Sequence, residues 1–156
     1  MANRLVFGFS VVLVVLFFLL SNFERYFFLL HFLQSALFLV ILVLLFYRLE
    51  EWAYVLGFLT SLLWLLLAVL QGMFFAGMRG LGQLAQLKAA ENPIDAVTGV
   101  IVLAQAALAV TSGYAYRKES WGLPEAKRAA LWGAAIIGVY YTLLIYALFR
   151  LSRPEG

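Results

Sequence analysis

Few side chains in this chain could do chemistry, and they lie within runs of sequence that are otherwise apolar. His31 is the only histidine, and Gln34 and Ser35 follow it on the same face of a helix. An imidazole takes up and releases protons near neutral pH. Because a polar group in an apolar environment is costly unless it is paired or hydrated, this group is a candidate binding or proton-transfer site.

A larger polar pocket at one end of the molecule is the most specific hypothesis that the sequence supports. Gln71 lies near the end of the third apolar run, at a depth similar to that of His31. The predicted members of this ligand-binding pocket are His31, Gln34, Gln71, Asp95, Thr98 and Tyr146. With His31 and a carboxylate as proton acceptors, the pocket would suit a lipid or a quinone in the outer leaflet.

Ordinary structural roles compete with this hypothesis. Asp95 follows Asn92 and Pro93 in a helix-capping motif, where an acid in the first turn complements the helix dipole. His31 is shallow enough, at roughly 7 Å below the interface by helical rise, to be solvated. Interhelical hydrogen bonding accounts for Gln71, and Tyr146 lies where interfacial tyrosines are common. The capping role is the favoured interpretation of Asp95.

A polar stripe runs along the fourth apolar run. Thr98, Gln105 and Ser112 recur every seven residues, and such a stripe can line a water path. The same segment is rich in alanine and glycine, which favours close helix packing with Gln105 bonded across the contact. We take packing as the favoured interpretation and conduction as the alternative.

Five long apolar runs must position these residues. About 18 or more apolar residues with few charges indicate a membrane-spanning helix, and all but the first run reach that length. The runs are Leu5–Leu20, Tyr26–Tyr47, Trp52–Met78, Ile94–Tyr116 and Ala129–Phe149. Hydrophobic residues make up 65% of the chain and charged residues 12%, so lipid is the expected solvent. The sequence therefore predicts one all-α integral membrane domain over residues 1–156, with five transmembrane helices, or four if the first run does not span.

The connectors and small residues add detail to this bundle. A short helix at the membrane interface is expected between the third and fourth spans, where leucines alternate with polar residues. Its leucines are Leu81, Leu84 and Leu87. Small residues in the third, fourth and fifth spans, including the pair Ala134 and Gly138, predict that these three helices form the packed centre. The first two spans are expected to face lipid or a partner.

Charge and aromatic residues predict the orientation. Of the eleven basic residues, six fall on the side of the N-terminus, so the positive-inside rule favours an inside N-terminus. We expect an inner (plasma) membrane of bacterial type. The aromatic belt predicted for the inner interface contains Tyr47, Trp52, Tyr54, Tyr114, Tyr116, Trp121 and Trp132.

Several kinds of chemistry lack the residues they need. The chain has no cysteine, and one histidine with one shallow aspartate does not make a metal site. There is no glycine-rich phosphate loop, no arginine series for voltage sensing and no basic stripe for nucleic acid. Enzymatic function is disfavoured, and neither a metal nor another cofactor is predicted, apart from the quinone or lipid of the pocket hypothesis.

Three functions fit these observations. The favoured one is a non-catalytic accessory or anchoring subunit of a larger membrane complex, because the chain has little mass outside its spans. The second is a small transporter or channel built from several copies, with the stripe of Gln105 turned toward a shared pore. The third is a lipid- or quinone-binding protein or enzyme that uses the pocket around His31. The expected partners are membrane lipids together with other membrane subunits or further copies of the chain, and not nucleic acid.

Overall fold

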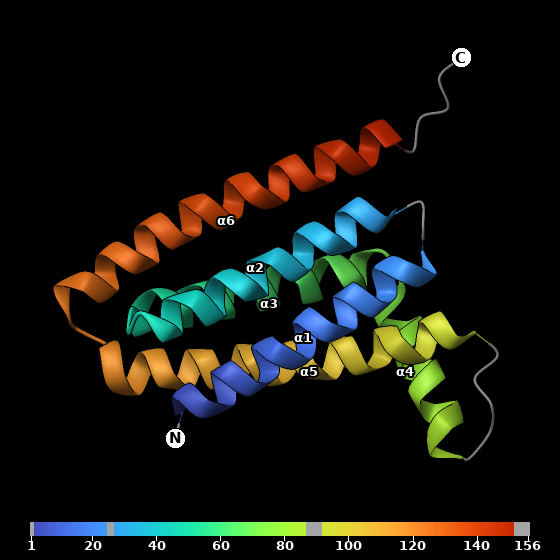
Figure 1. The fold of residues 1–156 in the computed structure, drawn as a ribbon, viewed down its shortest axis with the longest axis horizontal. Helices are drawn as coiled ribbons and strands as arrows, with labels where there is room; N and C mark the ends of the chain where they lie inside the picture. The colour runs from blue at the N-terminus through green and yellow to red at the C-terminus, as the bar shows by residue number, and fades with distance from the viewer. Residues whose placement is uncertain (1, 25–26, 87–91, 152–156) are drawn as a thin grey trace.

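The computed structural model describes residues 2–24, 27–86 and 92–151, and the elements within these ranges are all helices (Figure 1). The chain order is α1 (Ala2–Phe23), α2 (Phe28–Phe46), α3 (Glu50–Leu70), α4 (Met73–Ala85), α5 (Pro93–Ala115) and α6 (Pro124–Leu151). A π-helical turn, η2 (Tyr116–Ser120), continues α5. Together they form a bundle whose long helices run side by side.

Five of the helices are long and apolar enough to cross a membrane: α1, α2, α3, α5 with η2, and α6. The all-α class and the five candidate spans predicted from the sequence are therefore confirmed. The first apolar run is the core of a 22-residue helix. Because this helix includes the residues on both sides of Leu5–Leu20, it has the length of a span.

The capping motif predicted at the start of α5 is present. The Asn92 side chain accepts a hydrogen bond from the backbone N–H of Ile94 at 3.0 Å, and Pro93 occupies the first helical position. Asp95 lies in the first turn and accepts a hydrogen bond from the Asn92 amide at 3.3 Å. This local pattern fixes where the helix begins because it satisfies backbone donors that have no partner within the helix.

The third apolar run is not one helix, so the predicted continuous span Trp52–Met78 is wrong. α3 ends at Leu70, and Gly72 has a left-handed backbone with φ of 76°. Glycine adopts this conformation without steric strain, so the chain turns there and starts α4 at Met73. α4 lies between the third and fourth candidate spans and begins at Met73, before the segment in which a short interfacial helix was expected. Leu87 lies outside the described residues.

Glycine also sets how α4 packs on α5. A Cβ atom on Gly77 would lie 2.8 Å from the backbone nitrogen of Gly99, and one on Gly80 would lie 2.7 Å from that of Ala96. The two backbones thus approach too closely for any larger residue at these positions. This contact holds α4 along the first part of α5, as small residues do in helix pairs within membranes.

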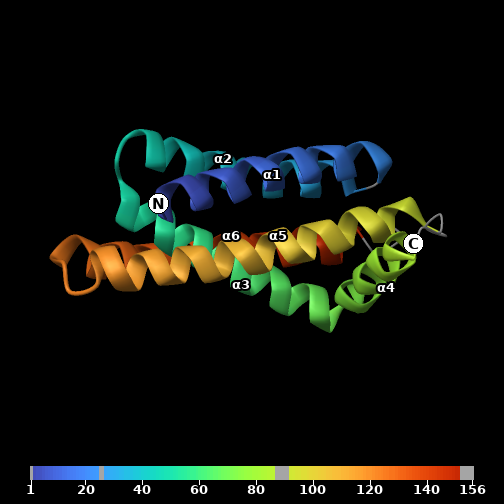
Figure 2. The ribbon, with the colours of Figure 1, turned by 90° about the horizontal axis from the view of Figure 1, so that it is seen from below.

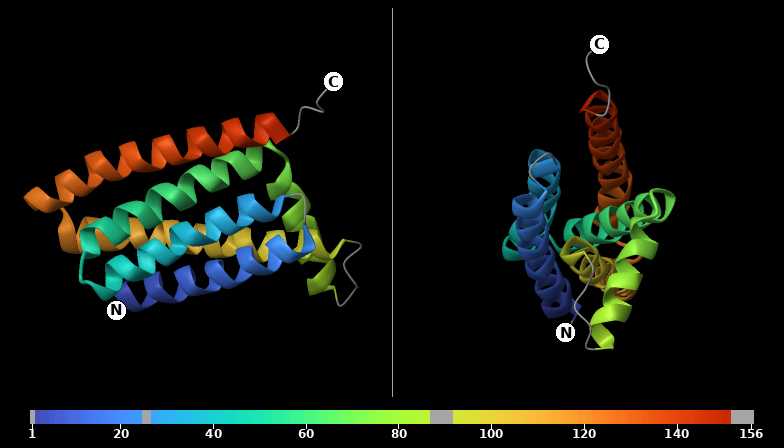
Figure 3. Two further views of the ribbon diagram at one scale, coloured as in Figure 1. Left: turned by 45° about the horizontal axis from the view of Figure 1, so that its top comes forward. Right: turned by 90° about the vertical axis from the view of Figure 1, so that its right-hand side faces the viewer.

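α3 and α5 form the centre of the bundle. α5 packs against α1, α3 and α4, and α3 packs against α2, α5 and α6. α1 and α2 lie as a pair on one side of the bundle (Figure 2). α6 runs along the periphery, mainly against α3 (Figure 3).

The position of α6 corrects the expected core. In their most apolar segments, 50% of the residues of α3 and of α5 are buried, against 28% in α6. The prediction that the third, fourth and fifth spans make up the packed centre is thus right for α3 and α5 and wrong for α6. Small residues permit a close helix contact, but they do not specify that the contact is made within the same chain.

Candidate functional site

His31 lies buried near the start of α2, with 4% of its surface exposed. Its Nε2 is 2.7 Å from the Glu24 carboxylate, and its ring stacks on Phe17. Its other ring nitrogen, Nδ1, is buried and has no hydrogen-bond partner among the described residues. The sequence did not reveal this pair, because Glu24 lies in the turn before α2. Whether its carboxylate contacts the histidine, seven residues further along the chain, depends on the path of that turn.

A small cavity beside His31 contains half of the predicted pocket. Its volume is about 50 Å³, and it is lined by three predicted residues, His31, Gln34 and Gln71, together with aromatic side chains that include Phe17 and Trp64. This volume has room for a few water molecules but not for a quinone ring. Gln71 is exposed in the turn after α3, because that helix ends before it.

The other three residues of the predicted pocket do not line this cavity. Asp95 and Thr98 lie on the part of α5 that packs against α4, where a Cβ on Gly77 would be 3.1 Å from the carbonyl carbon of Thr98. Tyr146 on α6 is 56% exposed. Three of the six predicted residues thus line one cavity, and the other three do not.

The polar stripe of α5 faces the interior of the bundle. Gln105 and Ser112 have no exposed surface, and Thr98 is 5% exposed. Neither amide atom of Gln105 nor the hydroxyl of Ser112 has a hydrogen-bond partner in the described ranges. The stripe therefore lies within one chain and not on a surface that neighbouring copies would share.

Further polar side chains are buried on α1 and α3. Ser10 on α1 and Thr60 and Ser61 on α3 are at most 1% exposed. Their hydroxyl groups also lack partners in the part of the chain that the structure describes. Such a concentration of unpaired polar groups is unusual, since most buried polar atoms in proteins are hydrogen-bonded.

A hydrogen-bonded network closes the end of the bundle at which α1 begins. The hydroxyl of Tyr54 donates to the Glu119 carboxylate at 2.7 Å and also contacts the side-chain oxygen of Asn3. The Asn3 amide donates to Glu50 at 2.6 Å. Tyr54 was predicted only as part of an aromatic belt. The network joins residues from three helices, so no local sequence signal could have identified it.

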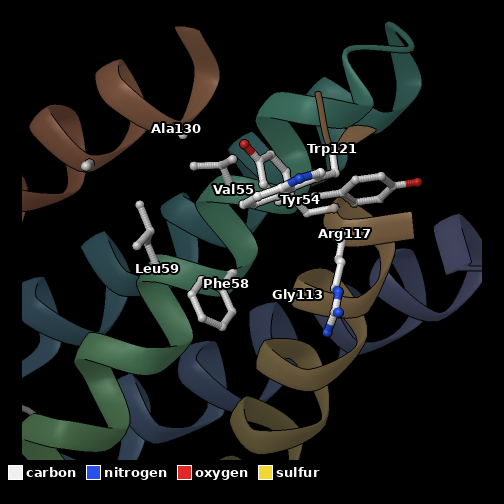
Figure 4. A pocket seen from close by; sticks show the side chains of 10 residues that line it. Tyr54, Val55, Phe58, Leu59, Gly113, Arg117, Trp121 and Ala130 are labelled. Atoms are coloured by element: carbon white, nitrogen blue, oxygen red, sulfur yellow. The ribbon is translucent and has the colours of Figure 1, made fainter. Parts of the chain in front are cut away.

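A groove lies next to this network, between α3, the end of α5 and α6. It has a volume of about 650 Å³ and is mostly apolar, with Phe58, Trp121 and Ala134 among its lining residues. Arg117 also lines it, and its side chain extends along α5 in Figure 4. No ion pair involves Arg117 within the described residues. We call this feature the α3–α6 groove.

The described residues contain no group of three or more histidine, cysteine, aspartate or glutamate side chains that could hold a metal ion. The described helices form a bundle with a hydrogen-bonded polar site toward each end, buried polar side chains without partners between them, and an apolar groove at its side. Five of these helices are long and apolar enough to cross a membrane. Comparison of the chain with models of protein families, with curated proteins and with solved structures finds no match.

Proposed function

We propose that this chain is a non-catalytic accessory or anchoring subunit of a larger membrane complex. It would hold a transmembrane helix of another membrane protein against the α3–α6 groove. The proposal rests on the outward face of α6. The small residues on this face leave space beside the helix that no other described part of the bundle fills.

The contrast between two sets of glycines supports this assignment. Gly77 and Gly80 are covered by the backbone of α5, as expected where helices pack closely. Around Gly138, no described atom lies within 4 Å of the position that a Cβ would take. Ala134, one turn earlier, is exposed and lines the groove. A helix of another protein could therefore approach α6 as closely as α4 approaches α5.

The charge in the groove favours a protein partner with a carboxylate at this level. Arg117 is exposed and has no acidic partner in the described ranges, while the nearby Glu119 carboxylate accepts from Tyr54. An arginine beside apolar walls binds a carboxylate strongly because two parallel hydrogen bonds form away from water. We place the N-terminus and this groove on the inner side of a bacterial-type plasma membrane, following the distribution of basic residues.

The proposal is tested by co-purification of the tagged chain from its own membranes in a mild detergent. Gly138→Leu fills the outward face with a larger apolar side chain where the bundle leaves space, so the fold should be retained and the partner lost. The matched control is Val139→Leu, at a position that is 61% exposed on a neighbouring face of α6. Equal recovery of the partner with both variants would overturn the proposed contact. If the chain instead associates with itself through α6, the occupant of this face is a second copy of the chain and not another protein.

A further inference from the structure

We propose that the interior of a single chain conducts protons between the Tyr54–Glu119 network and the His31–Glu24 pair through bound water. This activity is independent of the partner contact on α6. It accounts for the buried polar groups that have no partner and joins the two polar ends of the bundle.

The first part of the path starts at the Tyr54 network. Seven residues beyond Tyr54 along α3 lies Ser61, and seven residues before Glu119 lies Ser112. Along α3, two helical turns return a side chain to nearly the same face, about 10 Å further along the axis. The segment before Glu119 is π-helical from Tyr116, so Ser112 is placed by its contact with α3 and not by this spacing. Ser112 borders α3, because a Cβ on Gly57 would be 2.6 Å from its hydroxyl oxygen. Ser10 lies at the corresponding height on α1, seven residues beyond Asn3.

The next level is the amide of Gln105, seven residues before Ser112. α1, α3 and α5 pack against one another, and Ser10, Ser61, Gln105 and Ser112 on these helices are all fully buried. An unpaired buried donor or acceptor costs about 1–3 kcal/mol, and water is the usual partner where the protein supplies none. Water held by the serines and by Gln105 would link the levels into a chain of hydrogen bonds about 15 Å long, which is the helical rise of α3 from Tyr54 to Trp64.

Two aromatic side chains interrupt the path at its middle. α3 and α5 run antiparallel, so Trp64, seven residues beyond Gly57, lies at the level of Gln105. The rings of Phe17 and Trp64 meet edge to face with their centroids 5.8 Å apart. They also line the 50 Å³ cavity that contains His31. We assign to this pair the role of a barrier that water crosses only when the rings move.

Beyond the barrier, His31 is placed to pass protons to the surface. Water in the cavity can give a proton to Nδ1, which is buried and has no partner among the described residues, while Nε2 gives its own proton to the Glu24 carboxylate at 2.7 Å. One proton enters and one leaves, so the imidazole ends uncharged, with its proton on the other nitrogen. Glu24 is 28% exposed and can release the proton to the solvent.

The test uses the purified chain in liposomes that carry an internal pH-sensitive dye, with proton entry driven by a potassium gradient and valinomycin. We expect faster acidification than in protein-free liposomes, and loss of that excess with Gln105→Leu and with His31→Leu. Ser112→Ala removes only a hydroxyl and should slow the flux. Its matched control is Thr111→Val on the same helix, since the Thr111 hydroxyl donates to its own helix at 2.7 Å and is not part of the path.

Two results would overturn the inference. One is a wild-type flux no faster than that of protein-free liposomes, because the path lies within one chain and needs no partner. The other is an unchanged flux in Gln105→Leu. If that variant does not fold, the comparison of Ser112→Ala with Thr111→Val decides the question, and equal flux in the two rejects the path.

Discussion

His31 and Glu24 show how a single contact can place an ionisable side chain inside an apolar bundle. The histidine is almost fully buried, and the carboxylate is its one hydrogen-bond partner in the described part of the chain. From the sequence, His31 was recognisable as a candidate because it is unique and lies in an apolar run. Its partner was not, because a hydrogen bond across a turn depends on how the two helices α1 and α2 are joined.

Removal of the carboxylate should be costly at this position. Glu24→Ala leaves both nitrogens of a buried ring without a partner, so we expect a loss of about 1–3 kcal/mol in the free energy of unfolding. The control is Glu125→Ala, which breaks a pair with Arg128 whose side chains are 63% and 72% exposed. That change should alter stability by less than about 1 kcal/mol. Thermal unfolding in detergent measures both, and equal effects would contradict a structural role for the His31–Glu24 pair.

The contribution of the Tyr54 hydroxyl to stability can also be tested with a single substitution. Tyr54→Phe keeps the ring in the wall of the groove but removes the donor to Glu119, and we expect a loss of about 1 kcal/mol. Tyr114→Phe is the matched control, because Tyr114 is 59% exposed and its ring contact with Lys118 does not need the hydroxyl. Chemical denaturation of the two variants in the same detergent compares them, and identical midpoints would show that the network does not contribute to stability.

At the scale of helices, the apolar runs predict that a helix exists better than they predict the residues at which it begins and ends. The start of α5 was predictable because Asn92 and Pro93 form a local capping pattern. The end of α3 was not, because the apolar sequence continues through Gly72 and the turn adds no charged residue. Small residues of the third run were expected to pack, but the sequence did not show that Gly77 and Gly80 lie on a separate helix, α4, and pack against α5.

The contact between α4 and α5 gives an element-level prediction. Gly77→Ala places a Cβ 2.8 Å from the backbone of Gly99, which cannot move aside as a side chain can, so α4 should separate from α5. We expect a loss of about 1–3 kcal/mol and faster amide hydrogen exchange throughout α4. Gly82→Ala on the same helix is the control, since no described atom lies within 4 Å of its Cβ position. Unchanged exchange in Gly77→Ala would contradict the close packing.

At the scale of the whole molecule, the arrangement of α6 determines what the bundle can bind. A peripheral helix with an open face of small residues leaves the α3–α6 groove accessible from the surrounding membrane. The sequence identified Ala134 and Gly138 as a packing pair but assigned them to the interior, because a pattern of small residues does not indicate which neighbour fills the space. The absence of a protein neighbour on this face within the described residues is the basis of the proposed subunit role.

Native mass spectrometry of the tagged protein, extracted gently from its own membrane, tests this role most directly. We predict a complex that contains another membrane polypeptide at fixed stoichiometry, and its loss in Gly138→Leu but not in Val139→Leu. A monomer that carries only a lipid, or an assembly made of this chain alone, would contradict the account.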